Sequence, residues 1–141
     1  MLVKFLNGTE REIIDLRGAD LSGANLYGAN FQDANLRGAD LHDADLRWAN
    51  LRLADFCWAD FHGANLQDVY LRGANLLGAD LYGANFQDAN LCEADLYGAN
   101  LKRANFYRAC LKDANLDGAD IRWADFTGAE LIGTILEGVK I

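Results

Sequence analysis

A large apolar residue recurs at every fifth position through almost the whole chain. From Leu16 to Ile141, all 26 of these positions hold Leu, Phe or Ile. Alanine stands two residues before this apolar residue at 22 of the 23 sites from Ala19 to Ala129, and Asp or Asn usually stands directly before it. The residue two places after it is Gly at 13 and Asp at five of 25 sites. We call the large apolar residue the centre, the residue before it the Asx position, and the residue two after it the corner.

A period of five residues fits neither regular secondary structure. In an α-helix, five residues turn through about 500°, so successive centres would spread around the cylinder. In an extended strand, an odd step sends alternate centres to opposite faces. A chain that turns once per repeat, always in the same direction, points every centre and every preceding alanine inward. Such coils stack about 4.8 Å apart and bury their apolar side chains only against one another, which predicts a solenoid.

The polar positions of the motif predict a turn in each repeat. Gly or Asp at the corner suits the positive φ that a type II turn needs at its third position. Asp or Asn at the Asx position can accept a hydrogen bond from a nearby backbone amide. Seven corners carry neither Gly nor Asp, and we expect them to use other turn types; they are Trp48, Leu53, Trp58, Glu93, Arg103, Arg108 and Trp123.

The unbroken Ala-(Asp/Asn)-Leu-X-X series resembles the pentapeptide-repeat family, and the resemblance covers Asp15 to about Leu131. It implies an all-β fold, a right-handed quadrilateral parallel β-helix with four pentapeptides in each coil and about six to seven coils in all. We expect residues 1–14 to form an N-terminal cap and residues 15–141 the β-helix, with a degenerate final coil at 132–141. On this model the centres Phe86, Phe106 and Phe126 stack on one side.

Composition excludes several classes of protein. The chain has 141 residues, a formal charge of -8, 51% hydrophobic residues and no proline. An acidic excess argues against direct nucleic-acid binding and against anionic membrane surfaces. No stretch approaches the roughly 18 apolar residues of a membrane-spanning helix, and residues 1–14 lack the apolar run of a signal peptide.

Three cysteines, an odd number without metal-type spacing, predict a reducing cytoplasm and no disulfide framework. They are Cys57, Cys92 and Cys110, and the register places all three on the outside. Cys92 and Cys110 lie on one side but in different columns at the interval of twenty, so we do not expect them to pair.

All of the excess negative charge lies at the Asx positions. These hold ten Asp together with Glu130 and Lys140, whereas the positions after the centres carry a small positive excess and the first fourteen residues balance. Turn chemistry alone accounts for Asp or Asn there. However, Asp is concentrated in one column at intervals of twenty: Asp20, Asp40, Asp60, Asp80, Asn100 and Asp120. Because stacked like charges repel, this acidic stripe could imitate a row of phosphates for a basic partner groove.

No catalytic set and no cofactor fingerprint are visible in the sequence. His42 and His62 occupy equivalent outward positions beside Asp40 and Asp60, so a two-histidine, two-carboxylate metal site is conceivable. A stacked polar ladder explains the same residues, and we favour it. We therefore predict no enzyme activity, no metal and no cofactor.

Apolar residues outside the core and at the ends suggest contact surfaces. Trp48, Leu53 and Trp58 occupy corners of consecutive repeats, and the side of Trp58 continues with Leu77 and then Tyr97. Such residues often mark partner sites, although they could also cover neighbouring backbone. Open solenoid ends invite pairing, and Ile132 and Ile135 face outward, so we expect an incomplete cap or a homodimer contact there.

Two functional hypotheses follow. The first is a non-enzymatic solenoid that binds an unidentified protein partner. The second rests on the resemblance, because the family includes quinolone-resistance proteins of the Qnr and MfpA type, described as acidic rods that imitate DNA and occupy gyrase. The absence of an inserted loop and of a long C-terminal helix weakens that second reading.

Overall fold

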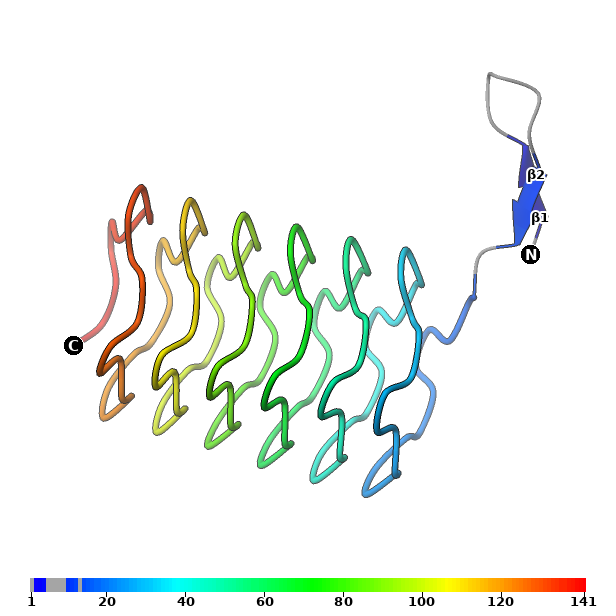
Figure 1. Ribbon diagram of the computed structural model, residues 1–141, viewed down its shortest axis with the longest axis horizontal. Coiled ribbons are helices and arrows are strands. Elements are labelled where there is room, and N and C mark those ends of the chain that lie inside the picture. Colours follow the sequence, from blue (N-terminus) through cyan, green and yellow to red (C-terminus); the bar gives the residue numbers. More distant parts are fainter. Residues whose placement is uncertain (1, 5–9, 13) are drawn as a thin grey trace.

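The computed structural model describes residues 2–4, 10–12 and 14–141. Successive coils stack along one axis into a rod that runs from the N-terminal to the C-terminal end of the chain (Figure 1). Twenty-two parallel bridges, from Asp15 with Asn35 to Asp120 with Lys140, join Asx positions twenty residues apart. Four pentapeptides therefore complete one coil, and residues twenty apart form columns along the rod. The predicted repeat solenoid is confirmed.

All five amide groups of a typical repeat have an acceptor. In the repeat Leu36 to Asp40, the Leu36 and Gly38 amides donate to the next coil, and the Asp40 amide donates to the preceding coil. The Ala39 amide closes the turn on the Leu36 carbonyl at 3.0 Å. The remaining amide, that of Arg37, donates to Oδ1 of the preceding Asx residue, Asn35, at 3.3 Å. This arrangement explains why the chain has no proline and why the Asx position requires a short side chain with an acceptor.

Every corner adopts the same backbone conformation. All 25 corners have φ between +55° and +73°, including the seven that carry neither Gly nor Asp. The prediction that those seven use other turn types is wrong. The inter-coil bonds on both sides of each turn fix its geometry, so these residues accept the left-handed region that disfavours them locally.

The core is a single column of centres and alanines. From Ala34 to Ala119 these side chains are almost completely buried, including Val69, which replaces the one missing alanine. Phe86 stacks on Phe106, and Phe106 on Phe126, with 4.8 Å between ring centroids in both pairs. Phe56 meets Phe61 edge to face within one coil. The predicted phenylalanine stack is confirmed.

The two ends of the rod are less enclosed. Strands β1 (Leu2–Lys4) and β2 (Glu10–Glu12) pair in antiparallel fashion beyond the first coil (Figure 1). The remainder of the predicted cap, residues 1, 5–9 and 13, lies outside the described residues. The centres Leu16, Leu21, Leu26 and Phe31 of the first coil are only partly buried. In the part of the chain that the structure describes, no helix is long and apolar enough to cross a membrane.

Candidate interaction surfaces

One side of the rod carries large apolar or aromatic side chains on three successive coils. Trp58 is 66% exposed, and its amide donates to the Leu77 carbonyl of the next coil at 2.9 Å. The Gly78 amide in turn donates to the Tyr97 carbonyl of the coil after that. Trp58, Leu77 and Tyr97 therefore lie on three successive coils of one side, and we call them the Trp58 strip.

The other two predicted members of this patch lie elsewhere. Trp48 and Leu53 are both exposed, but each pentapeptide occupies the next side of a four-sided coil. Trp48 and Trp58 are two pentapeptides apart, so they stand at opposite corners of the rod. The structure brings Trp58, Leu77 and Tyr97 together and separates them from Trp48 and Leu53.

Bulky corner side chains cover the corner glycines of the next coil. A Cβ atom at Gly78 would overlap the Trp58 ring, and one at Gly73 would lie 2.8 Å from Cδ2 of Leu53. Both large corner side chains thus extend along the rod and are paired with a residue that has no side chain. This packing fixes the orientation of the exposed Trp58 ring.

The acidic stripe contains the only Asp-on-Asp contacts among the Asx bridges. Asp20 pairs with Asp40, Asp40 with Asp60, and Asp60 with Asp80, whereas the other bridged Asp residues have non-acidic neighbours. In other columns an Asn amide often donates to the Asx residue below it, as Asn75 does to Asp55 at 3.1 Å and Asn115 does to Asp95 at 3.1 Å. A carboxylate has no such proton, so the stripe replaces this ladder by charge repulsion from Asp20 to Asp80.

The far end of the acidic stripe is neutralised. Asp120 is only 9% exposed, and both Arg122, at 2.7 Å, and Lys102, at 3.4 Å, contact its Oδ2 atom. The hydrogen bond from Arg122 holds the pKa of the Asp120 carboxyl well below its ordinary range. Asp120 therefore differs in character from Asp60 and Asp80 and contributes little negative surface.

The two histidines have different partners. Nδ1 of His42 lies 2.7 Å from Oδ1 of Asp40, and this hydrogen bond raises the pKa of His42. The His62 ring meets Tyr82 edge to face, with 5.2 Å between centroids. Among the described residues, no group of three or more His, Cys, Asp or Glu side chains is arranged to hold a metal ion.

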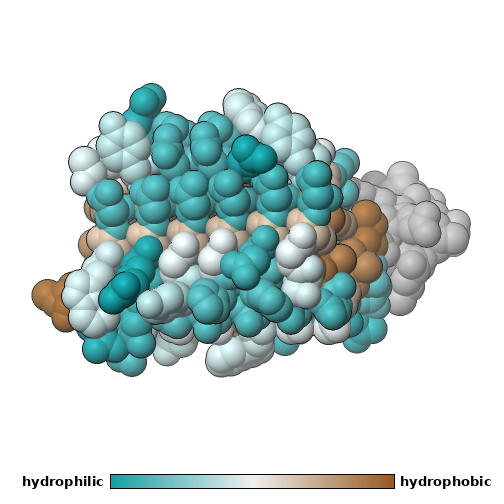
Figure 2. Space-filling view, turned by 90° about the horizontal axis from the view of Figure 1, so that it is seen from below, coloured by the Kyte–Doolittle hydropathy of each residue, from teal (hydrophilic) through white to brown (hydrophobic). Residues whose placement is uncertain are grey.

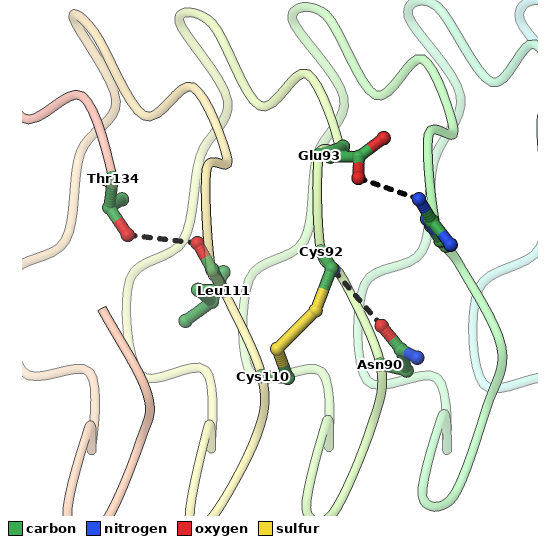
Figure 3. The surroundings of a disulfide bond; sticks show 7 residues. Asn90, Cys92, Glu93, Cys110, Leu111 and Thr134 are labelled. Atoms are coloured by element: carbon green, nitrogen blue, oxygen red, sulfur yellow. Dashed lines mark hydrogen bonds and ion pairs between the residues drawn. A yellow bond between two sulfur atoms is a disulfide. The ribbon is translucent and has the colours of Figure 1, made fainter. Parts of the chain in front are cut away.

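Cys92 and Cys110 form a disulfide bond between adjacent coils, with their Cα atoms 5.7 Å apart (Figure 3). The prediction that they do not pair is wrong. It considered only contacts at intervals of twenty, but the side chain after a centre also reaches the Asx position eighteen residues ahead. Arg37 with Asp55, Gln32 with Asn50 and Lys102 with Asp120 make this same contact. This interval was the signal that could have identified the disulfide.

Cys57 is also placed differently from its prediction. It occupies the outward position after its centre but is only 4% exposed, and it carries a free thiol. With two of three cysteines paired, cysteine usage no longer favours a reducing compartment.

Two shallow hollows of about 230 and 270 Å³ share Arg72 and Glu93 as lining residues, and Cys92 of the disulfide also lines the second. These two side chains form an exposed ion pair, with 2.8 Å between Nη2 of Arg72 and Oε1 of Glu93 (Figure 3). The residues around them carry charges of both signs, so the hollows have no single electrostatic character.

Trp123 is an exposed aromatic that the sequence argument passed over as a surface residue. It is 72% exposed and lies 5.9 Å from the Arg103 guanidinium and 5.6 Å from that of Arg122. Arg103 lies twenty residues before Trp123, and Arg122 directly precedes it. The sequence alone could therefore have indicated these two positive residues beside the ring.

The C-terminal end of the rod is apolar. Ile132 and Ile135 are exposed as expected, and Leu136 and Ile141 join them, with Ile141 93% exposed. Brown, hydrophobic surface is visible at the end opposite the grey residues and also beside them, whereas rows of hydrophilic side chains run along the rod between the two ends (Figure 2).

Comparison with known families agrees with this geometry. A family model for pentapeptide repeats matches residues 14–52, 39–78, 49–88, 84–122 and 111–141. The chain belongs to the pentapeptide-repeat family. A search of curated proteins gave no match.

Solved structures of other pentapeptide-repeat proteins are similar. HetL from the cyanobacterium Nostoc sp. strain PCC 7120, involved in the regulation of heterocyst differentiation, is 33% identical over 89% of this chain and 67% of its own, with a TM-score of 0.53. Rfr23 from the cyanobacterium Cyanothece 51142 is 27% identical over 89% and 86% of the two chains, with a TM-score of 0.66. A trypsin-treated form of QnrB1, a plasmid-mediated fluoroquinolone resistance protein, is 23% identical over 92% and 83%, with a TM-score of 0.57, and supports the fold alone.

Proposed function

We propose that this pentapeptide-repeat protein is a right-handed quadrilateral β-helix of six to seven coils that acts as a non-enzymatic protein-interaction module. The observation that carries the proposal is the Trp58 strip, in which Trp58, Leu77 and Tyr97 lie on successive coils of one side. Large aromatic and aliphatic side chains dominate the binding energy of protein interfaces. The partner is a protein, with no direct nucleic-acid or membrane contact, because the excess charge is negative.

Preorganisation supports a binding role for Trp58. Its ring extends over Gly78, where no side chain competes for the space. A ring that is already held in one orientation loses little conformational freedom on binding. The exposed C-terminal residues Ile132 and Ile135 are the second proposed contact, through which two copies would associate end to end.

Substitution of Trp58 tests the strip. Trp58→Gly removes the ring and leaves a residue that suits the corner, where φ is +61°. We expect purified partner to lose at least tenfold in affinity for this variant. Trp48→Gly, at the opposite corner with φ of +62°, is the matched control and should bind as the unmodified protein does. Equal loss in both variants, or no loss in either, would contradict the site.

The acidic stripe supports a second candidate, a DNA-mimicking inhibitor of DNA gyrase or another topoisomerase. Three consecutive Asp-on-Asp contacts occur in this column alone among the Asx bridges. Asn would fill the same position without repulsion, so the choice of Asp has a cost that the fold does not require. Charges about 4.8 Å apart form a negative row, which a basic groove would attract.

A supercoiling assay separates the two candidates. If the second is correct, the unmodified protein inhibits gyrase, and Asp40→Asn, Asp60→Asn and Asp80→Asn together relieve the inhibition. Asp55→Asn with Asp95→Asn, on another side of the rod, is the control and should leave inhibition in place. Absence of inhibition by the unmodified protein would exclude gyrase as its target.

A further inference from the structure

The side of the rod that carries the acidic stripe has opposite charges in its two halves. Its centres are Leu21, Leu41, Phe61, Leu81, Leu101, Ile121 and Ile141, and we call it the bipolar side. The half nearer the N-terminus holds five acids and neither Lys nor Arg: Asp20, Asp40, Asp43, Asp60 and Asp80. The half nearer the C-terminus holds four bases and one acid: Lys102, Arg103, Arg122, Lys140 and Asp120.

The charges at the middle of the bipolar side face solvent. Asp80 and Arg103 are both exposed, and Lys140 at the C-terminal end is exposed as well. Lys102 and Arg122 both form ion pairs with Asp120, so these three residues together carry one net positive charge. The two halves therefore present a negative and a positive surface within one continuous side.

We propose that the bipolar side binds a second copy of this chain, with the two rods antiparallel and face to face. A two-fold axis that crosses the side between the Asp80 coil and the Arg103 coil superimposes the negative half of one copy on the positive half of the other. Each contact of such an isologous interface occurs twice. Interfaces of complementary charge of this kind fix the register of the partners.

Equal coil spacing fixes the register of the contact. The Asp80 coil of one copy meets the coil of Lys102 and Arg103 in the other. The Asp60 coil then meets that of Arg122, and the Asp40 coil meets that of Lys140. Because each column meets itself, Asp60 faces Asp120, which Arg122 and Lys102 neutralise, and the opposed coils carry opposite net charge at Asp80 and at Asp40.

The corners of the bipolar side fit the same register. A two-fold axis within the interface brings each corner column against itself, so Gly83 meets Arg103 and Gly63 meets Trp123. No atom outside its chain neighbours lies within 4 Å of a Cβ position at Gly83, whereas Trp123 is 72% exposed. Arg103 therefore meets an uncovered glycine, whereas the Asp43 carboxylate extends over Gly63 and would face Trp123.

The size of the surface predicts a weak dimer. One side is a strip roughly 30 Å long at a spacing of about 4.8 Å per coil, so the contact is smaller than a standard interface. We expect sedimentation equilibrium of the full chain to show a concentration-dependent dimer. Asp80→Lys and Arg103→Asp should each weaken dimerisation at least tenfold, and the two substitutions in one chain should restore it to within about threefold.

Matched variants keep this test independent of folding. Asp95 accepts hydrogen bonds from the Tyr97 amide and from Asn115, as Asp80 does from the Tyr82 amide and Asn100. Asp95→Lys on another side removes the same two hydrogen-bond acceptors and should leave the dimer intact. Asp80→Asn, which keeps the acceptor oxygen, should weaken the dimer less than Asp80→Lys.

Four outcomes would overturn the proposal. They are a monomer at all concentrations up to about 1 mM, a dimer unaffected by Asp80→Lys, equal weakening by Asp95→Lys, and failure of the double reversal to restore association. A dimer that Ile132→Asp disrupts and Asp80→Lys does not would assign dimerisation to the C-terminal end instead. The dimer test is independent of the Trp58→Gly experiment, because the Trp58 strip takes no part in the contact between the two bipolar sides. A loss of partner binding in that variant therefore leaves the expected dimerisation unchanged.

Discussion

At the scale of single residues, the corner shows how strongly the coil controls local conformation. Trp58 and Arg108 adopt φ of +61° and +58°, close to the values of the corner glycines. The left-handed conformation costs a non-glycine residue about 1–2 kcal/mol, and the inter-coil hydrogen bonds must offset that cost. The sequence predicts the conformation where Gly or Asp occurs. The sequence does not predict the conformation at corners such as Trp58, where hydrogen bonds to neighbouring coils impose a positive φ on a residue that disfavours it.

Two glycines of the same corner column separate backbone strain from packing. Gly78 and Gly98 both have φ of +64°, but only Gly78 lies beneath the Trp58 ring. We expect Gly98→Ala to lower the free energy of unfolding by about 1 kcal/mol and Gly78→Ala to lower it further, with a changed Trp58 fluorescence. Urea titration of both variants measures the difference. In a Trp58→Gly background the two losses should become equal, and a persistent difference would contradict the packing.

The His42–Asp40 pair makes stability depend on pH. Asp40 raises the pKa of His42 above its ordinary value of 6.5. The ion pair therefore stabilises the fold fully at pH values below 6.5, and this stabilisation is lost as the pH rises through the raised pKa of His42. We expect Asp40→Asn to lower the pKa of His42, as followed by NMR titration of its ring protons. An unchanged pKa in that variant would show that Asp40 is not the cause.

At the scale of one coil, the backbone amides of each repeat donate to carbonyl groups of the two neighbouring coils, to one carbonyl group of their own turn and to one Asx side chain. The register of five and the identity of the Asx residues predicted this arrangement, because both depend on local chemistry. The Cys92–Cys110 disulfide was missed because it depends on the offset between adjacent coils. A motif of five fixes which residues face outward, but not which outward side chains of two coils meet.

Reduction of the disulfide should destabilise the coils that it joins. A cross-link that closes a loop of this length contributes roughly 3 kcal/mol in the chain-entropy account. We expect dithiothreitol to lower the melting temperature of the unmodified protein, as measured by circular dichroism. Cys92→Ser with Cys110→Ser should melt at the lower temperature with or without reductant. The same shift on reduction in that double variant would assign the effect to something other than the bond.

At the scale of the whole molecule, the arrangement of charge distinguishes the four sides. Intervals of twenty located the acidic stripe in the sequence, and the structure places those residues in one column. The sequence argument did not separate Asp120 from the other acids, because its burial and its two cationic partners depend on neighbouring columns. It also grouped Trp48 with Trp58, although consecutive pentapeptides face different directions. Partner surfaces are therefore less predictable than the fold, since they combine residues from several columns.

The most direct test of the account is whether the acidic stripe opposes folding. The central claim is that Asp at these positions serves a contact on the surface rather than the stability of the coil. Asp60 stacks between Asp40 and Asp80, whereas Asp95 stacks between Asn75 and Asn115. Asn at position 60 keeps the acceptor for the His62 amide and can donate to Asp40, as Asn100 donates to Asp80 at 2.9 Å.

Urea unfolding of Asp60→Asn and Asp95→Asn measures that opposition, since both substitutions remove one negative charge at the same motif position. The account predicts that Asp60→Asn unfolds at higher urea, with a free energy of unfolding about 0.5–1 kcal/mol above that of Asp95→Asn. Equal stability, or a less stable Asp60→Asn variant, would contradict it.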